Sequence, residues 1–319
     1  MKKSSRISFI NIVALLGYAL AAFAVFMGAM LTTGGSIGAA LAIALGSVVV
    51  LYLIIRGACY AKSADTDINR WKKVEIVLVV LFWLAAIFPS FYISHFVRVL
   101  GDGERIHAMA ADDAGRISRL FSEYELFENN ALSITRVGLE TAIGQPMDQP
   151  LEAYMRSASI SSPDDIDTWM NTQRGLLLGN TGVDGFSYIS FRENVDSVIN
   201  NWLSAVNASD VMFMAVHGND LDDLAPDVAE RLTLTSSQAK LPGVEFINGV
   251  YSASPLEQKT VLTAPSMEFA DSIHALDGSV MGYVLAAVIM FLIFLNYIMT
   301  RRSGLTQLQS YDLSEGNSL

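Results

Sequence analysis

The densest group of side chains that could do chemistry lies at residues 217–223, in the sequence HGNDLDD. It combines the imidazole of His217 with the carboxylates of Asp220, Asp222 and Asp223, and divalent cations accept both kinds of ligand. The same residues suit an acidic loop before a helix, because carboxylates in a first helical turn complement the helix dipole. The pattern favours the helix start, and cation binding by this loop stays an open alternative.

Other chemical motifs are weak. The four histidines, His95, His107, His217 and His274, show no spacing typical of a zinc site. The glycine-rich run 179–185 (GNTGVDG) lacks the lysine and hydroxyl residue of a phosphate-binding loop. Paired acids such as Asp164 and Asp165 are ordinary at helix starts. We therefore expect no catalytic residue, no cofactor and no metal, and we predict that the protein is not an enzyme.

The elements that would position any site begin with four apolar runs. The chain has 319 residues, of which 52% are hydrophobic and 17% charged, whereas a soluble domain has about 25% charged residues. The runs 10–32, 37–55, 76–97 and 280–300 each approach the roughly 20 residues that cross a hydrocarbon core. A cleaved signal peptide is the alternative for the first run, but its apolar part is too long. The sequence therefore predicts four transmembrane helices in a lipid bilayer.

The positions of Lys and Arg predict the orientation of these spans. Basic residues cluster in the N-terminal segment 1–9, in the loop 56–75 and in the tail 301–319. Because basic loops stay on the cytoplasmic side, both termini are expected to be cytoplasmic, and residues 98–278 to lie outside. That outer segment holds 11 basic and 27 acidic residues, a net charge of −16. An acidic surface does not suit nucleic acid, which binds basic patches.

Cysteine usage indicates the compartment. The only cysteine, Cys59, lies in the basic loop, so the outer domain has no disulfide. A domain of this size can fold without disulfides, and their absence is more typical of a bacterial periplasm than of a eukaryotic exterior. We therefore expect a bacterial inner-membrane protein whose residues 98–278 are periplasmic or extracellular.

The outer domain opens with a long amphipathic helix. Its heptad a and d positions are Ile106, Ala110, Asp113, Ile117, Leu120, Tyr124, Phe127, Ala131 and Ile134. A second helix is predicted after the cap Ser162 and Pro163. The segments 183–191, 210–216, 244–252 and 258–264 have the composition of strands. The sequence thus predicts a helix-rich α+β domain inserted between spans three and four, with an all-helical bundle as the alternative.

Three groups of residues are candidates for specific roles. The stripe Leu120, Phe121, Tyr124 and Phe127 is a candidate interaction surface, with packing inside its own domain as the alternative. The ladder Gly34, Gly38, Ala42 and Gly46 is a candidate helix-packing face, directed at span one or at another protein. Pro89 removes one helical hydrogen bond and is expected to bend span three.

Two functions of different classes fit this topology. The first is a non-enzymatic subunit or scaffold of a cell-envelope complex, which acts through its acidic extracytoplasmic domain. Its partner would be a membrane or periplasmic protein, or a second copy in a homo-oligomer. The alternative is an extracytoplasmic ligand sensor that passes a signal through spans three and four to a separate protein.

Overall fold

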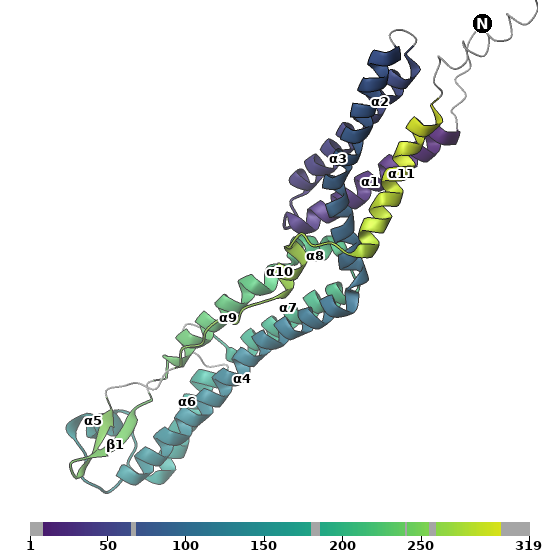
Figure 1. The fold of residues 1–319 in the computed structure, drawn as a ribbon. Coiled ribbons are helices and arrows are strands. Elements are labelled where there is room, and N and C mark those ends of the chain that lie inside the picture. The colour runs from purple at the N-terminus through teal and green to yellow at the C-terminus, as the bar shows by residue number, and fades with distance from the viewer. Residues whose placement is uncertain (1–8, 65–67, 180–185, 240, 255–259, 301–319) are drawn as a thin grey trace, which may run out of the picture. The chain divides into compact units, whose positions relative to one another are not determined.

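The computed structural model describes residues 9–64, 68–179, 186–239, 241–254 and 260–300 (Figure 1). They form two compact units, and each is described by itself. The four-helix unit contains the described residues of 1–106, 208–218 and 270–319. The α4 unit contains those of 107–207 and 219–269. The predicted terminal segments 1–9 and 301–319 lie almost wholly outside the described residues.

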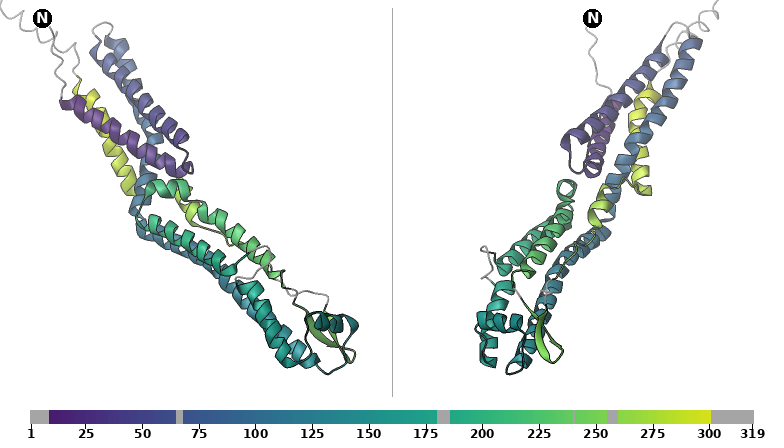
Figure 2. Two further views of the ribbon diagram at one scale, coloured as in Figure 1. Left: turned by 180° about the vertical axis from the view of Figure 1, so that it is seen from behind. Right: turned by 90° about the vertical axis from the view of Figure 1, so that its left-hand side faces the viewer.

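Four helices of the first unit are long and apolar enough to cross a membrane, as the four apolar runs predict. They are α1 (Phe9–Thr32), α2 (Ile37–Ser63), α3 (Ile68–Gly101) and α11 (Val280–Met299). Both α2 and α3 extend into the predicted basic loop 56–75, which is therefore largely helical. The four helices lie side by side in every view (Figures 1 and 2). This composition indicates a membrane-embedded protein.

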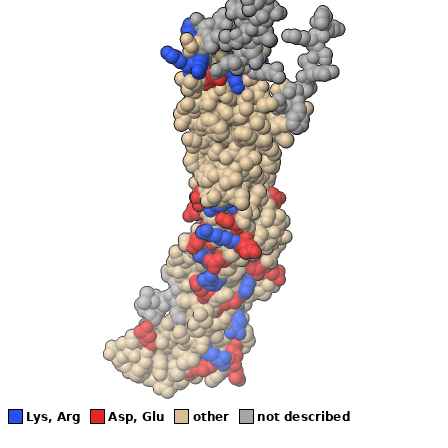
Figure 3. Space-filling model, turned by 45° about the vertical axis from the view of Figure 1, so that its right-hand side comes forward, with Lys and Arg blue, Asp and Glu red and all other residues tan. Residues whose placement is uncertain are grey.

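The surface of the four helices is apolar outside as well as inside. Their shared core includes Val25, Leu51, Phe82 and Ile293, all almost fully buried. Large apolar side chains such as Leu15, Leu53 and Val77 are more than half exposed on the outer faces. In the space-filling view this surface carries no charged side chain over a broad band (Figure 3). Such a band is costly in water and suits contact with lipid.

Glycines allow α3 to approach two neighbouring helices closely. A Cβ atom on Gly28 of α1 would lie 2.1 Å from the carbonyl oxygen of Tyr92 in α3. A Cβ atom on Gly282 of α11 would lie 2.5 Å from Cα of Ser94. In lipid, close backbone packing of this kind replaces the hydrophobic drive that joins helices in water.

The small-residue ladder on α2 takes no part in this packing. Gly34 lies in the turn before α2 with φ +58°, and an added Cβ on Gly38 or Gly46 meets no atom within 4 Å. Ala42 is exposed. The buried face of α2 is instead Ala40, Ala44, Leu51, Ile55, Ala58 and Ala61. The ladder therefore does not pack closely on span one, and a different face of α2 is buried.

Pro89 lies inside α3, and the helix continues past it to Gly101. Proline has no N–H, so the carbonyl of Ala85 loses its usual helical donor. Ser90 donates its hydroxyl to the carbonyl of Ala86 at 2.6 Å. The bend at Pro89 stays a prediction. Beyond it, only Asp102 separates α3 from α4 (Gly103–Ala142), and the backbone N–H of Asp102 still donates to the carbonyl of Arg98 at 2.8 Å.

At the end where α2 and α3 are joined, Lys62 connects α2 to α11. Its ammonium donates to the carbonyls of Tyr297 at 2.9 Å and Ile298 at 3.2 Å, and lies 4.4 Å from the centre of the Tyr297 ring. The Tyr297 hydroxyl donates to Glu75 of α3 at 2.6 Å. A cation placed at the C-terminal carbonyls of α11 also complements the helix dipole.

The α4 unit is mainly helical. Its helices are α4, α5 (Gln149–Ser157), α6 (Pro163–Leu178), α7 (Tyr188–Asn207) and α9 (Asp220–Ser236). Strands β1 (Gly243–Ile247) and β2 (Val250–Ser254) form an antiparallel hairpin through the left-handed turn Asn248 and Gly249. The predicted start of α6 is confirmed, because Ser162 and Asp165 form a reciprocal capping box.

Three of the four predicted strands are wrong within the described residues. Residues 188–191 begin α7, residues 211–216 lie in α8 (Val211–His217) of the four-helix unit, and residues 260–264 form no strand. Residues 244–252 are not one strand but most of the hairpin. The rest of 183–191 and 258–264 lies outside the described residues. Short apolar runs fit a buried helical face as well as a strand, and tertiary packing selects the helix.

We predict that Gly28→Ala destabilises the four-helix unit by about 1–3 kcal/mol, because the methyl group would collide with backbone of α3. The measurement is thermal unfolding in detergent, followed by circular dichroism. Gly46→Ala is the matched control, since its methyl group meets no atom within 4 Å. Equal loss of stability in both variants would contradict the close contact of α1 with α3.

Candidate functional site

The predicted interaction stripe lies inside the α4 unit. Leu120, Phe121 and Tyr124 are at most 3% exposed, and Phe127 is half-buried. The Tyr124 ring stacks on Tyr188 of α7 at 5.5 Å, and its hydroxyl donates to the carbonyl of Leu177 at 3.2 Å. Leu120, Phe121 and Tyr124 are therefore core of the folded unit and are not available to a partner, whereas Phe127 stays partly exposed.

The heptad pattern predicts the buried residues correctly along most of α4 but not near its C-terminal end. Asp113, the one charged residue of the pattern, is buried and accepts hydrogen bonds from the backbone N–H of Glu268 at 2.9 Å and Phe269 at 2.8 Å. Ile134 is 61% exposed. A straight helix drifts about 20° per heptad from a seven-residue repeat, so Ile134 is displaced by about 80° from the position of Ile106.

An uncharged face of α4 is exposed in place of the predicted stripe. Leu126, Ile134 and Val137 are 64%, 61% and 56% exposed. At 100° per residue these three side chains fall within a sector of about 80°. Asn130 and Thr141 lie in the same sector and Ser133 lies about 20° beyond its edge, and all three are exposed and uncharged. We name these six residues the α4 outer face. A periodicity of 3.6 residues predicts that this face lies opposite the buried one, whereas the heptad pattern assigns Ile134 to the buried face.

Glu128 is a buried acid of α4 without a hydrogen bond. It is 0% exposed, and neither carboxyl oxygen has a partner within the described part of the chain. Burial raises the pKa of Glu128 from 4.5 to about 8, because the charged form loses its hydration. The carboxyl is thus protonated at neutral pH. Burial, followed by the charge of Glu128, also raises the pKa of the Tyr124 phenol.

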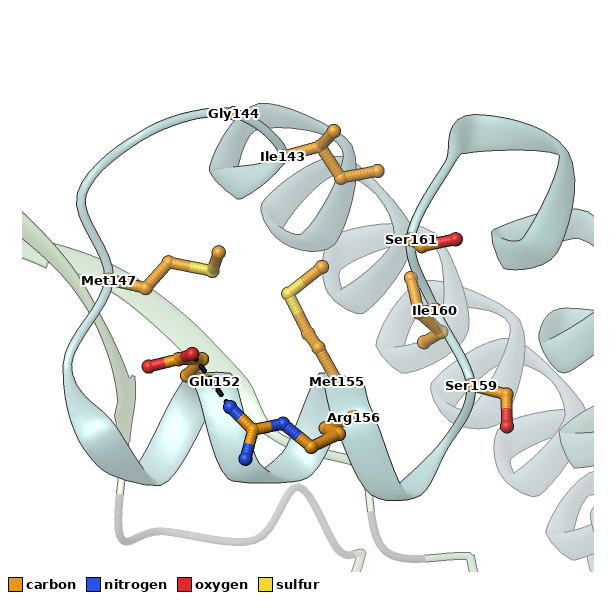
Figure 4. Close-up of a pocket in the computed structure, with 9 residues that line it drawn as sticks. All are labelled: Ile143, Gly144, Met147, Glu152, Met155, Arg156, Ser159, Ile160 and Ser161. Carbon is orange, nitrogen blue, oxygen red and sulfur yellow. Dashed lines mark hydrogen bonds and ion pairs between the residues drawn. The ribbon is translucent and has the colours of Figure 1, made fainter.

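A groove of about 490 Å³ lies where α4, α5 and α6 are connected (Figure 4). Its apolar lining is Ile143, Met147, Met155 and Ile160. Arg156 and Glu152 form an ion pair at its edge, with Nη2 and Oε1 2.8 Å apart. The hydroxyl of Ser161 donates a hydrogen bond to the carboxylate of Asp165 at 2.8 Å. The groove is open, and because its lining is both apolar and polar it suits a small ligand that carries groups of both kinds.

The acidic loop after His217 divides between the two units. Asp220, Asp222 and Asp223 occupy the first turn of α9, as the helix-start interpretation expects. His217 ends α8, and its ring stacks on Phe213 with centres 4.6 Å apart. Among the described residues, no group of three or more His, Cys, Asp or Glu could hold a metal ion.

The turn before α2 contains a sequence motif that also occurs in hydrolases. The turn 34–38, GGSIG, has the Gly-x-Ser-x-Gly spacing of a nucleophile elbow. Ser36 has φ −70° and ψ 95°, which is ordinary extended backbone, and it precedes α2 as the N-cap residue. An elbow serine sits on a strained turn beside a histidine base. The backbone of Ser36 has no such strain, so the motif carries no catalytic assignment.

A polar network holds the last turns of α3 to residues 272–279. The ring nitrogens Nδ1 and Nε2 of His95 lie 2.9 Å from the carbonyl oxygens of Asp277 and Ile273. Arg98 donates to the carbonyl of Ser272 at 2.6 Å and forms an ion pair with Asp277 at 3.5 Å. These bonds satisfy carbonyl groups of a segment that is mostly irregular, and they fix it to α3.

Comparison of the chain with protein families, curated proteins and solved structures gave no match.

We predict that the stability of the protein falls with rising pH through Glu128. Its folded-state pKa is raised, so the folded state holds a proton that the unfolded chain releases between pH 4.5 and about 8. The stabilising contribution of Glu128 is therefore fully present below pH 4.5 and falls by on the order of 1 kcal/mol per pH unit up to about pH 8. The measurement is the unfolding midpoint in detergent across this range.

Glu128→Gln removes the titrating group and is expected to flatten this pH dependence. Glu123→Gln, which changes an exposed acid of the same helix, is the control and should keep the wild-type slope. A slope that survives in Glu128→Gln would assign the effect to other groups.

Proposed function

We propose that the protein is a non-enzymatic, multi-pass membrane subunit or scaffold of a cell-envelope complex. In this proposal the α4 unit, which includes most of the acidic segment 98–278, is extracytoplasmic and binds a protein partner. The observation that carries the proposal is the α4 outer face, with three large aliphatic side chains more than half exposed on one helix.

The chemistry of the α4 outer face supports a helical protein partner. Leu126, Ile134 and Val137 supply aliphatic surface, and the other three residues of the face, Asn130, Ser133 and Thr141, are uncharged, so burying the face desolvates no charge. The ion pair of Arg136 with Glu140 flanks it, with Nε and Oε1 2.7 Å apart. An apolar centre with a charged rim is typical of protein interfaces. The opposite face of α4 is buried in its own unit, which holds the helix in place for docking.

The distribution of basic residues supports the proposed orientation of the four-helix unit in its membrane. Arg56, Arg70, Lys72 and Lys73 are exposed at one end of the four-helix unit. Figure 3 shows Lys and Arg gathered at that end. By the positive-inside rule we propose that this end, and with it both termini, is cytoplasmic.

The test is purification of the full chain from its native membranes in mild detergent, with quantitative mass spectrometry. The double variant Leu126→Glu and Val137→Glu is expected to lose a stoichiometric envelope protein by tenfold or more, a change of about 1.4 kcal/mol or more in binding. The control, Ala111→Glu with Ser122→Glu, adds the same charge at exposed positions outside the face and should retain it. Circular dichroism confirms that both variants fold.

The outcomes separate the forms of the proposal. If the protein lost by the Leu126→Glu and Val137→Glu variant is a second copy of this chain, the complex is a homo-oligomer. If both double variants retain every partner, the α4 outer face is not the interface.

A second function, extracytoplasmic ligand sensing, is favoured by the groove beside Met147 and Met155. Native mass spectrometry of the purified protein would then detect a small bound molecule of constant mass. Met147→Trp, which fills the groove, should abolish binding of this molecule. If the wild-type protein carries no bound small molecule and the protein complex is intact, the sensor function is ruled out and only the subunit function remains.

A further inference from the structure

Helix α8, with the sequence VMFMAVH, differs in composition from the helices that flank it in the chain. It carries no Asp, Glu, Lys or Arg, whereas α7 contains Arg192, Glu193 and Asp196, and α9 starts with three aspartates. It also belongs to the four-helix unit, although α7 and α9 belong to the other. The chain therefore returns to the candidate membrane helices for this one uncharged segment.

Contacts of α8 with α1 and with the turn after it show where α8 lies along the four helices. Val211, Met214 and Ala215 are buried, and α8 packs against α1. A Cβ atom on Gly35 would lie 2.7 Å from Cα of Val216. Gly35 belongs to the short turn between α1 and α2, where two candidate spans end. The helix thus lies beside the turn that joins α1 and α2, at the end of these two candidate spans (Figure 1).

The free face of α8 is apolar. Met212 and Val216, one helical turn apart, are 38% and 48% exposed. The first turns of α2, which directly follow the turn that contacts Val216, expose Ile37 by 60% and Leu41 by 47%. The free face of α8 is therefore continuous with the apolar outer surface of the spans.

We propose that α8 is an interfacial helix whose Met212 and Val216 side chains contact the lipid bilayer. The occupant of this face is lipid because the surface that it continues is the lipid-facing surface of α2. Short amphipathic helices bind this way, with the apolar face at the boundary of headgroups and acyl chains. The stacked pair of Phe213 and His217 flanks the face and is suited to the same boundary. The chain between α7 and α9 is thereby attached to the membrane at a point separate from α3 and α11.

The test is spin-label accessibility in proteoliposomes, using the full chain in a Cys59→Ser background. Nitroxides are attached to Met212→Cys and Val216→Cys, and collision rates with oxygen and with a water-soluble nickel chelate are measured. Leu41→Cys, on an exposed apolar residue of α2, gives the lipid reference. Asp271→Cys, on an exposed charged residue of the same unit, gives the aqueous reference.

The proposal expects the ratio of oxygen to nickel collisions at positions 212 and 216 to be severalfold above the Asp271→Cys ratio and close to the Leu41→Cys ratio. A water-like ratio at both positions would overturn it. Strong immobilisation with low access to both reagents would mean that protein, such as a second copy, covers the face, and would overturn it too. Because all four labelled side chains are exposed, the variants are expected to fold, and circular dichroism checks this.

Discussion

Every backbone amide of a membrane-spanning segment must find its hydrogen bond inside the chain, because hydrocarbon offers no partner. This constraint makes the four apolar segments helices, and the rest of the structure is built on them. Lipid gives little hydrophobic drive between such helices, so their assembly depends on close backbone approach. The contacts of Gly28 with Tyr92 and of Gly282 with Ser94 supply it, and α3 takes part in both.

The C-terminal end of α3 shows how polar groups are accommodated at the edge of such a bundle. His95 and Arg98 project from the last turns of α3 and bond carbonyl groups of residues 272–277. A neutral imidazole carries one N–H, so His95 donates to both carbonyls only when its ring is protonated. The network joins the helix that leads out of the four-helix unit to the segment that leads back into it.

Helix α4 combines a structural face and an exposed face, and the proposed function rests on the second. Its buried side includes Tyr124 and the protonated Glu128, and its outer side carries Leu126, Ile134 and Val137. The residues first selected for interaction, Leu120, Phe121, Tyr124 and Phe127, belong to the structural face. A large apolar residue on an amphipathic helix is informative about binding only when its burial is known, because core and interface share the same composition.

The sequence by itself determined the four candidate spans, the long amphipathic helix and the capped start of α6, because these follow from local hydrophobicity, periodicity and cap chemistry. Tertiary structure decided which face of α2 packs, where the α4 heptad leaves the core, and that residues 211–216 are helix. It also decided that Glu128 is buried without a partner. These features depend on atoms far away in the sequence. Local patterns specify that a face is apolar or small, whereas packing geometry selects what, if anything, covers it.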